Sequence, residues 1–201
     1  MTALCLLVAV GLSNAAENDA GSSPVLLILG DSLSDAYNLP REAGWAHGLA
    51  DRLAGDMHVV NASISGDTTA GGVARLPELL AEHQPSHLLL ILGGNDGLRA
   101  LSPAQLERNL GAIIERAQAQ SVEVFLMQIR LPANLGPAYL DRFERVYPRL
   151  ADQHGLELLP FFLEDIFDQP GMIMEDGIHP SEQAQPKMLE ALWSALAPLL
   201  P

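Results

Sequence analysis

The chain has 201 residues, of which 48% are hydrophobic, and its 25 acidic and 11 basic side chains give a net charge of −14. This hydrophobic content excludes a disordered acidic protein, and the length suffices for one domain with its own core. The negative charge repels phosphate backbones and anionic bilayers, so we expect no nucleic acid partner.

The chain opens with a stretch typical of a secretory leader. An apolar run from Ala3 to Leu12 is followed by small residues, in the order of an h-region and a cleavage site, although no Lys or Arg precedes it. The run is shorter than the roughly 20 residues of a spanning helix, so we expect no stable membrane anchor. We predict a signal peptide over residues 1–16, a single domain over residues 17–201, and a periplasmic or secreted protein.

Beyond the leader, short apolar runs alternate with longer amphipathic stretches. The runs predict strands that are buried on both faces, over Val25–Leu29, His58–Ala62, His87–Leu92, Val122–Met127 and Gly155–Leu159. The amphipathic stretches predict helices over Trp45–Leu53, Gly71–His83, Pro103–Gln120, Pro137–His154 and Ser181–Leu200. This alternation predicts repeated βα units, and therefore an α/β domain around a mostly parallel sheet.

Polar segments follow the first three predicted strands. They are GDSLS at residues 30–34, ASISGDTT at 62–69 and GGNDG at 93–97, and a further segment, DGIHP at 176–180, precedes the last helix. Open parallel sheets bind ligands outside the carboxyl ends of their strands, so we expect the first three segments to meet at one edge.

Two of these segments supply the parts of a nucleophilic site. A serine hydroxyl needs a base within hydrogen-bond reach, and that base needs a group that orients it. We predict Ser32 as the nucleophile and His179 as the base. Asp176, three residues before the histidine and separated from it by a flexible glycine, is predicted to orient the imidazole.

The oxyanion formed by such an attack needs hydrogen-bond donors. We predict the backbone N–H groups of Ser32 and Gly66 and the side-chain amide of Asn95 as these donors, because each follows a strand at the same sheet edge. They are the predicted substrate-binding residues.

The four polar segments, in this order, resemble the signature blocks of the SGNH/GDSL hydrolases. The serine, glycine, asparagine and histidine of that family name fall on Ser32, Gly66, Asn95 and His179. Other stretches, among them VVNASISGDT, LGGNDGLR and DGIHPSEQAQP, are similar to the periplasmic thioesterase, protease and lysophospholipase branch, which includes arylesterases. The resemblance extends over about residues 25–200.

This resemblance implies a flavodoxin-like three-layer α/β/α sandwich, the SGNH hydrolase fold, with a five-stranded parallel sheet in the order 2-1-3-4-5. It implies a serine esterase or thioesterase that forms an acyl-enzyme on Ser32 and hydrolyses aryl esters, acyl thioesters or lysophospholipids. The implied partner is a small acyl ester or thioester, with no cofactor and no metal, and we expect a monomer. A mobile loop over about Gly97–Leu101 is also implied.

Two positions depart from the family pattern. Asp35 stands where relatives usually have a small residue, and it adds a negative charge close to the nucleophile. Leu135 stands where an aromatic residue is common. We expect both departures to affect the substrate pocket rather than the chemistry.

Two other classes of protein share parts of the pattern. A metal-dependent phosphoesterase would use similar Asp, Asn and His segments, but the first strand is not followed by an Asp-x-His pair. A non-catalytic flavodoxin-like module could hold phosphate with its SGDTT segment, but that leaves Ser32, Asp176 and His179 without a role. A G-x-S-x-G elbow is absent around Ser32, which argues against a classical α/β-hydrolase.

Overall fold

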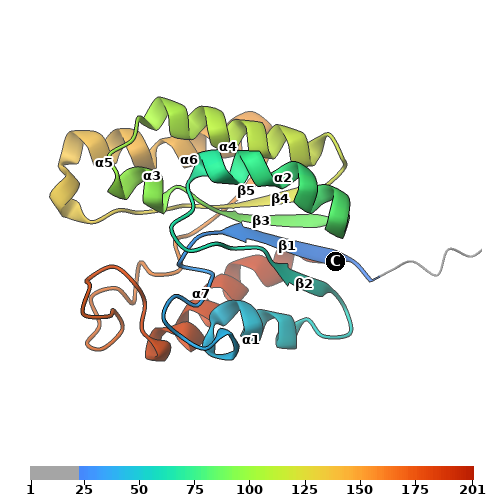
Figure 1. The fold of residues 1–201 in the computed structure, drawn as a ribbon, viewed down its shortest axis with the longest axis horizontal. Helices are drawn as coiled ribbons and strands as arrows, with labels where there is room; N and C mark the ends of the chain where they lie inside the picture. The colour runs from blue at the N-terminus through green and yellow to red at the C-terminus, as the bar shows by residue number, and fades with distance from the viewer. Residues whose placement is uncertain (1–22) are drawn as a thin grey trace, which may run out of the picture.

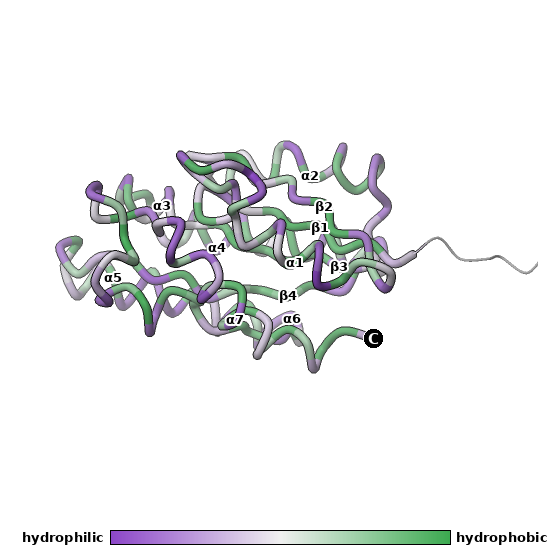
Figure 2. Tube along the Cα trace, turned by 90° about the horizontal axis from the view of Figure 1, so that it is seen from below, coloured by the Kyte–Doolittle hydropathy of each residue, from purple (hydrophilic) through white to green (hydrophobic). Residues whose placement is uncertain are grey.

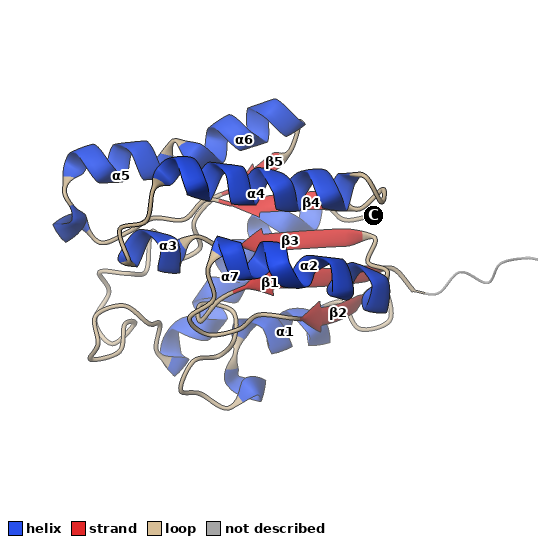
Figure 3. Ribbon diagram, turned by 45° about the horizontal axis from the view of Figure 1, so that its top comes forward, coloured by secondary structure: helices blue, strands red, loops and turns tan. Residues whose placement is uncertain are grey.

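The computed structural model describes residues 23–201, and the predicted signal peptide lies outside them. Five strands form one parallel sheet in the order β2-β1-β3-β4-β5, as the resemblance implied. Their bounds are β1 (Val25–Gly30), β2 (His58–Asn61), β3 (His87–Ile91), β4 (Glu123–Met127) and β5 (Glu157–Leu159). Figure 3 shows that all of them point the same way, so their carboxyl ends share one edge.

Helices cover both faces of the sheet and complete the three layers (Figure 1). One face carries α1 (Trp45–Arg52) and α7 (Gln185–Leu196), which pack on each other. The other face carries α2 (Thr69–His83), α4 (Pro103–Gln118) and α6 (Val146–His154). The shorter helices α3 (Gly94–Leu98) and α5 (Pro137–Glu144) lie toward the carboxyl edge.

The core is built from the central strands and the apolar faces of these helices. Every residue of β3 is buried, as is every residue of β1 after Val25, and both strands are coloured as hydrophobic in Figure 2. Fully burying one such leucine contributes about 2 kcal/mol. The apolar runs of β1 and β3 therefore correspond to strands covered on both faces. The same prediction is wrong for the edge strand β2, in which His58 and Asn61 are exposed and the two valines between them are half-buried.

The helix predicted over Pro137–His154 is interrupted at Arg145, so that α5 and α6 are separate. Pro148 causes the interruption, because it has no N–H to donate to the carbonyl of Glu144 and its ring crowds that carbonyl. The carbonyl of Glu144 instead accepts from Gln128 Nε2 at 3.3 Å.

The last helix is also shorter than the predicted Ser181–Leu200. A 3-10 turn over Glu182–Ala184 precedes α7, and another over Ala197–Leu199 follows it. Pro186 lies in the first turn of α7, where its missing N–H costs nothing, whereas Pro198 cannot continue the helix and shortens it.

Two glycines at the carboxyl edge are required by close packing. A Cβ on Gly30 would lie 2.8 Å from the hydroxyl oxygens of both Ser34 and Ser63. Gly93 has φ +121°, and a Cβ there would lie 2.1 Å from the hydroxyl of Tyr147. Side chains at either position would displace the segments that follow β1 and β3.

Candidate active site

The structure joins Ser32, His179 and Asp176 by hydrogen bonds at the carboxyl edge of the sheet. His179 Nε2 lies 3.0 Å from Ser32 Oγ, and its Nδ1 lies 2.7 Å from Asp176 Oδ2. Because Asp176 accepts at Nδ1, that nitrogen carries the proton and Nε2 is left as an acceptor for the serine hydroxyl. The three residues therefore have the geometry of a nucleophile, a base and an orienting carboxylate.

Ser32 is held by a tight turn that begins where β1 ends. The carbonyl of Asp31 accepts from the N–H groups of Ser34 and Asp35, both at 3.0 Å. The side chain of Asp31 also accepts from the N–H of Leu33 at 3.1 Å. The position of Ser32 is thus fixed directly by the central strand.

Asp31 is an unusual carboxyl group, because its side chain is only 2% exposed. Burial raises its pKa to about 7, and the negative charges of Asp67 and Asp96 act in the same direction. Hydrogen bonds from Leu33 and Asn95 oppose this rise without cancelling it. A carboxyl that titrates near neutral pH therefore lies next to the nucleophile.

Asp176 lies in a contrasting environment, with 40% of its side chain exposed. Its partial burial acts to raise the pKa, but hydrogen bonds from His179 and from the N–H of Ile178 outweigh this and lower the pKa to about 2. The backbone N–H groups of His179 and Ile178 donate to Oδ1 at 3.0 and 2.9 Å. Asp176 is therefore ionised at neutral pH and orients the imidazole as an anion.

The segments after β2 and β3 are joined by buried polar contacts. Asp96, 2% exposed, accepts from both the N–H and the hydroxyl of Thr69 at the start of α2. Arg75 of α2 pairs with Asp67 at 2.8 Å and donates to the carbonyls of Ala62 and Gly30. These contacts hold the ends of β1, β2 and β3 together.

The three predicted oxyanion donors lie in different relations to the site. Ser32 and Asn95 both line the cavity described below, and Asn95 Nδ2 donates to Asp31 Oδ2 at 3.2 Å. Gly66, with φ +80°, is not among the residues lining this cavity, and its carbonyl accepts from Arg99 at 3.0 Å.

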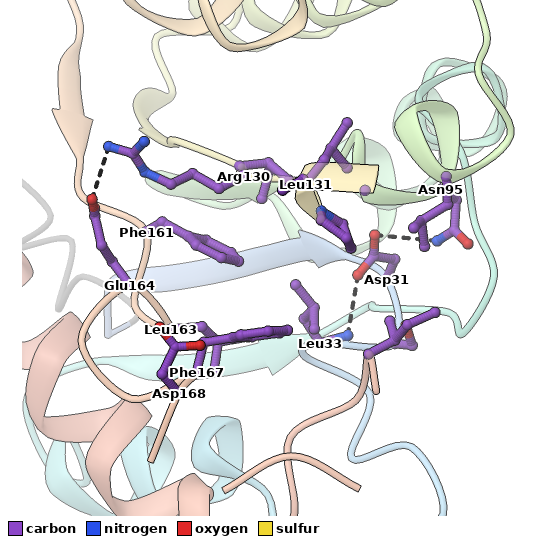
Figure 4. Close-up of a pocket in the computed structure, with 17 residues that line it drawn as sticks. Asp31, Leu33, Asn95, Arg130, Leu131, Phe161, Leu163, Glu164, Phe167 and Asp168 are labelled. Atoms are coloured by element: carbon purple, nitrogen blue, oxygen red, sulfur yellow. Dashed lines mark hydrogen bonds and ion pairs between the residues drawn. The ribbon is translucent and has the colours of Figure 1, made fainter. Parts of the chain in front are cut away.

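A cavity of about 340 Å³ opens beside Ser32, which is one of its lining residues. In Figure 4, Asp31 and Asn95 lie at one side of this cavity, and Arg130, which pairs with Glu164 at 2.9 Å, lies at the other. Apolar side chains line the wall between them, including Leu33, Leu98, Leu131, Phe161, Leu163 and Phe167. A cavity of this size and composition fits a flexible hydrocarbon group bound to the reacting carbon.

The residues that depart from the family pattern lie away from this cavity. Asp35 accepts from the N–H and hydroxyl of Ser65 at 3.0 and 2.8 Å and lies 3.8 Å from Arg41. Among residues 23–201, the cavity lining includes Ala133 but neither Asp35 nor Leu135. The expectation that these two side chains shape the pocket directly therefore has no support in this cavity.

Sequence reasoning missed several residues of the site. Tyr37 stacks on the ring of His179, and the segment 161–168 forms one wall of the cavity. Helix α3 was also missed, and it includes Gly97 and Leu98 of the loop that we expected to be mobile. The signal available in the sequence was the presence of aromatic residues close to predicted elements. Tyr37 follows the segment of the nucleophile, and Phe161 follows the last predicted strand.

Over residues 23–201, no group of three or more His, Cys, Asp or Glu side chains is arranged to hold a metal ion. No helix within the same range has the length and apolar character to cross a membrane.

A serine, a histidine and a carboxylate in hydrogen-bond sequence, at the edge of a parallel sheet and beside an apolar cavity, define the class of serine hydrolases that act on acyl groups. The model of the GDSL-like lipase/acylhydrolase family matches residues 28–185. The chain belongs to this family. Its membership confirms the class predicted from the sequence, a carboxylic ester hydrolase, over the phosphoesterase and the binding module.

Close relatives agree with this assignment. The chain is 50% identical to esterase TesA of Pseudomonas aeruginosa over 182 residues, covering 89% of this chain and 90% of that protein. It is 47% identical to thioesterase 1/protease 1/lysophospholipase L1 of Escherichia coli K12, covering 90% and 87%. The crystal structure of esterase EstA from Pseudoalteromonas sp., inhibited by monoethylphosphonate, is 34% identical with a TM-score of 0.84, covering 88% and 98%.

Proposed function

We propose that this protein hydrolyses acyl esters and thioesters through an acyl-enzyme formed on Ser32. The observation that carries the proposal is the hydrogen-bonded sequence Ser32, His179, Asp176, which opens on an apolar cavity beside the serine. The names of the relatives, esterase and thioesterase 1/protease 1/lysophospholipase L1, support acyl esters, thioesters and lysophospholipids as the substrate range.

In the first step, Ser32 Oγ bonds to the acyl carbonyl carbon while His179 Nε2 takes the hydroxyl proton. The carbonyl oxygen becomes an oxyanion, to which the N–H groups of Ser32 and Gly66 and the amide of Asn95 donate. The bond from carbon to the leaving oxygen or sulfur then breaks, and His179 returns its proton to the leaving group. The product of this half-reaction is an ester on Ser32.

In the second step, His179 removes a proton from water while the water oxygen attacks the acyl-enzyme. The bond between the acyl carbon and Ser32 Oγ breaks, and the serine regains its proton from the imidazolium. Asp176 stays ionised through both steps, because its pKa of about 2 lies far below neutral pH. Its role is to orient the ring and to stabilise the positive charge that forms on it.

Assays of single variants with a p-nitrophenyl ester test the mechanism. Ser32→Ala and His179→Ala are each expected to abolish turnover, while circular dichroism shows an intact fold. A fluorophosphonate is expected to label the wild-type protein and the control Ser194→Ala, whose exposed hydroxyl donates to the carbonyl of Ala191 within α7, but not Ser32→Ala. Turnover by Ser32→Ala at the wild-type rate would refute the proposal.

We also propose that the protein is exported to the periplasm or secreted as a monomer, with residues 1–16 removed. The apolar run from Ala3 to Leu12 supports export. Amino-terminal sequencing of the protein recovered from the periplasm and medium tests the cleavage, and light scattering tests the monomer. Recovery of the uncleaved chain from the cytoplasm would contradict export.

A further inference from the structure

The aromatic ring of Tyr37 lies almost flat against the imidazole of His179. The two ring centroids are 3.9 Å apart, and the planes are inclined by 23°. Tyr37 is half-buried and comes from the segment after β1, whereas His179 comes from the loop before α7. The contact therefore joins the two segments that supply the nucleophile and the base.

This contact restrains a motion that the hydrogen bonds of His179 oppose only weakly. The ring is bonded at Nδ1 to Asp176 at 2.7 Å and at Nε2 to Ser32 at 3.0 Å. These bonds hold the two nitrogens in place, but hydrogen bonds tolerate some angular misalignment, so small tilts of the ring out of its plane cost little. A contact on the face of the ring opposes such tilts directly, and Tyr37 supplies one.

The segment that carries Tyr37 is itself held in place by hydrogen bonds from other elements. Each of the three residues that follow Ser32 accepts a hydrogen bond from another element. Trp45 Nε1 donates to the Leu33 carbonyl at 2.7 Å, and Asn61 Nδ2 donates to the Ser34 carbonyl at 2.7 Å. The Ser65 hydroxyl donates to Asp35 Oδ2 at 2.8 Å. The base of the Tyr37 side chain is therefore fixed with respect to β1 and β2.

The backbone on both sides of Tyr37 adopts a conformation that side chains rarely accept. Ala36 has φ +53° and Asn38 has φ +55°, both in the left-handed region. Alanine, unlike asparagine, does not readily tolerate this conformation, and it persists only where the surrounding structure imposes it. Gly44 packs so closely here that a Cβ on it would lie 2.9 Å from the Cβ of Ala36. The strained turn presents Tyr37 to His179.

The aromatic ring, rather than the hydroxyl, makes the contact with the site. Among residues 23–201 the hydroxyl of Tyr37 makes no hydrogen bond, and Tyr37 is not among the residues lining the cavity. The electron-rich face of a tyrosine attracts a cation within about 6 Å of its centroid, and the imidazole becomes a cation when it takes the serine proton. The imidazole is therefore contacted by the carboxylate of Asp176 at Nδ1 and by the electron-rich face of Tyr37.

We propose that Tyr37 is a positioning residue for His179, whose ring fixes the tilt of the imidazole and stabilises the imidazolium during proton transfer. This proposal rests on the proposed function, in which His179 is the base. It assigns Tyr37 no contact with the substrate, so its removal changes the chemical step and not the binding of substrate.

Steady-state kinetics with a p-nitrophenyl ester that has a short acyl chain test this assignment. Tyr37→Leu is expected to lower kcat by about 10-fold with KM within about twofold, the size of a lost cation–π contact. Tyr37→Phe keeps the ring and is expected to retain kcat within about twofold. The rate of inactivation by a fluorophosphonate is expected to fall in Tyr37→Leu by the same factor as kcat.

The control is Trp193→Leu, which removes another half-buried aromatic ring that covers a cation, here Arg52 at 5.1 Å. Trp193 lies on α7 opposite the carboxyl-terminal end of α1, which leads into the start of β2. Because this position is away from the carboxyl edge of the sheet, Trp193→Leu is expected to leave kcat unchanged. Where thermal unfolding shows that Tyr37→Leu is not folded, Tyr37→Gln replaces it as a variant without an aromatic face.

Three results would overturn the assignment: wild-type kcat in Tyr37→Leu, an equal loss in Tyr37→Phe, or a change confined to KM. The parallel Ser32→Ala variant separates this outcome from failure of the proposed function. If Ser32→Ala is inactive while folded Tyr37→Leu is fully active, only the role of Tyr37 is wrong. If Ser32→Ala retains turnover, the mechanism itself is wrong.

Discussion

The two segments that meet at the candidate active site are built in opposite ways. The segment after β1 holds its carboxyl, Asp31, almost fully buried, and the pKa of that group is raised to about 7. The loop before α7 holds its carboxyl, Asp176, partly exposed, and hydrogen bonds lower that pKa to about 2. At neutral pH, ionisation of the buried Asp31 lowers the stability of the fold, whereas the ionised Asp176 is stabilised by its hydrogen bonds.

The two segments also differ in how they are anchored. Ser32 follows a central strand directly, so the sheet fixes it. His179 lies in a loop whose ends are closed by an antiparallel bridge between Ile173 and Pro180 and by a 2.8 Å hydrogen bond from the N–H of Met174 to the His179 carbonyl. The base is therefore oriented mainly by Asp176 and Tyr37, and the nucleophile mainly by the fold. Variants of each segment can test this division.

Beyond the loss of Ser32 or His179 themselves, the largest expected effect is on activity, when the orienting carboxylate is removed. Asp176→Asn presents an amide to His179 Nδ1 and favours the wrong tautomer, so kcat is expected to fall on the order of 10⁴-fold. The melting temperature at pH 7 is expected to fall modestly, because the hydrogen bonds that lower the pKa of Asp176 also stabilise the fold at this pH, by an amount that the partial exposure of the side chain reduces. Stopped assays and thermal unfolding measure both, and a loss below tenfold would contradict the role of Asp176.

The next effect is on stability, and it depends on pH. The folded-state pKa of Asp31, about 7, lies above its ordinary value of 3.8, so its stabilising effect is present below pH 3.8 and is lost as pH rises through 7. Asp31→Asn cannot ionise. The free energy of unfolding of this variant minus that of wild type is expected to increase by on the order of 4 kcal/mol as the pH rises from 4 to 8.

Urea unfolding of both proteins at several pH values measures this difference. Asp176→Asn is the matched control with the opposite sign, since the folded-state pKa of Asp176 is lowered. The contribution of the Asp176 carboxylate to the stability of wild type is present above pH 3.8 and is lost as the pH falls toward 2, and the variant lacks this contribution. A difference between Asp31→Asn and wild type that does not change with pH would mean that Asp31 ionises normally in the fold.

The sequence was most informative about features that depend on residues close together in the chain. Continuous apolar runs predicted all five strands, and the blocks after them predicted that Ser32 and Asn95 would share a site. The spacing of Asp176 and His179 predicted their hydrogen bond, because a turn over three residues leaves few arrangements. These features depend on hydrophobic period and local chain geometry, both of which a sequence contains.

The features that were missed depend on tertiary packing. Helix α3 has two glycines within five residues and little intrinsic preference to be helical, but Gly97 packs against Leu131 and the N–H groups of its turn find carbonyl partners. The stacking of Tyr37 on His179 joins residues from opposite ends of the chain. The raised pKa of Asp31 follows from burial, which the motif alone does not state.

A smaller effect on stability is expected from the arginine that ties the strand ends together. Arg75→Met leaves Asp67 and the carbonyls of Ala62 and Gly30 without their partner in a mostly buried setting. The expected loss is about 2 to 3 kcal/mol, which corresponds to a fall in melting temperature of roughly 4 to 12 °C for a chain of this size. Calorimetry measures it.

The matched control for this variant is Arg149→Met. Arg149 bonds to Glu107 at 3.0 Å, but its side chain is 51% exposed, so its loss is expected to cost less than about 1 kcal/mol. Equal losses in the two arginine variants would show that the carboxyl edge does not depend on the buried contacts of Arg75.

The smallest effect is expected at the strained turn that presents Tyr37. Ala36→Gly removes an unfavourable left-handed alanine, which costs about 1 to 2 kcal/mol, but glycine adds about 0.5 to 1 kcal/mol of unfolded-state entropy. The net gain is about 0.5 kcal/mol, or a rise in melting temperature of roughly 1 to 2 °C.

The matched variant at this turn is Asn38→Gly, which is expected to gain nothing, because asparagine tolerates the left-handed region. In Ala36→Gly, kcat is expected to stay within about twofold of wild type. Glycine adopts φ +53° without strain, and the hydrogen bonds of Leu33, Ser34 and Asp35 still hold the segment. A fall in both kcat and melting temperature would instead mean that the alanine side chain itself supports the turn.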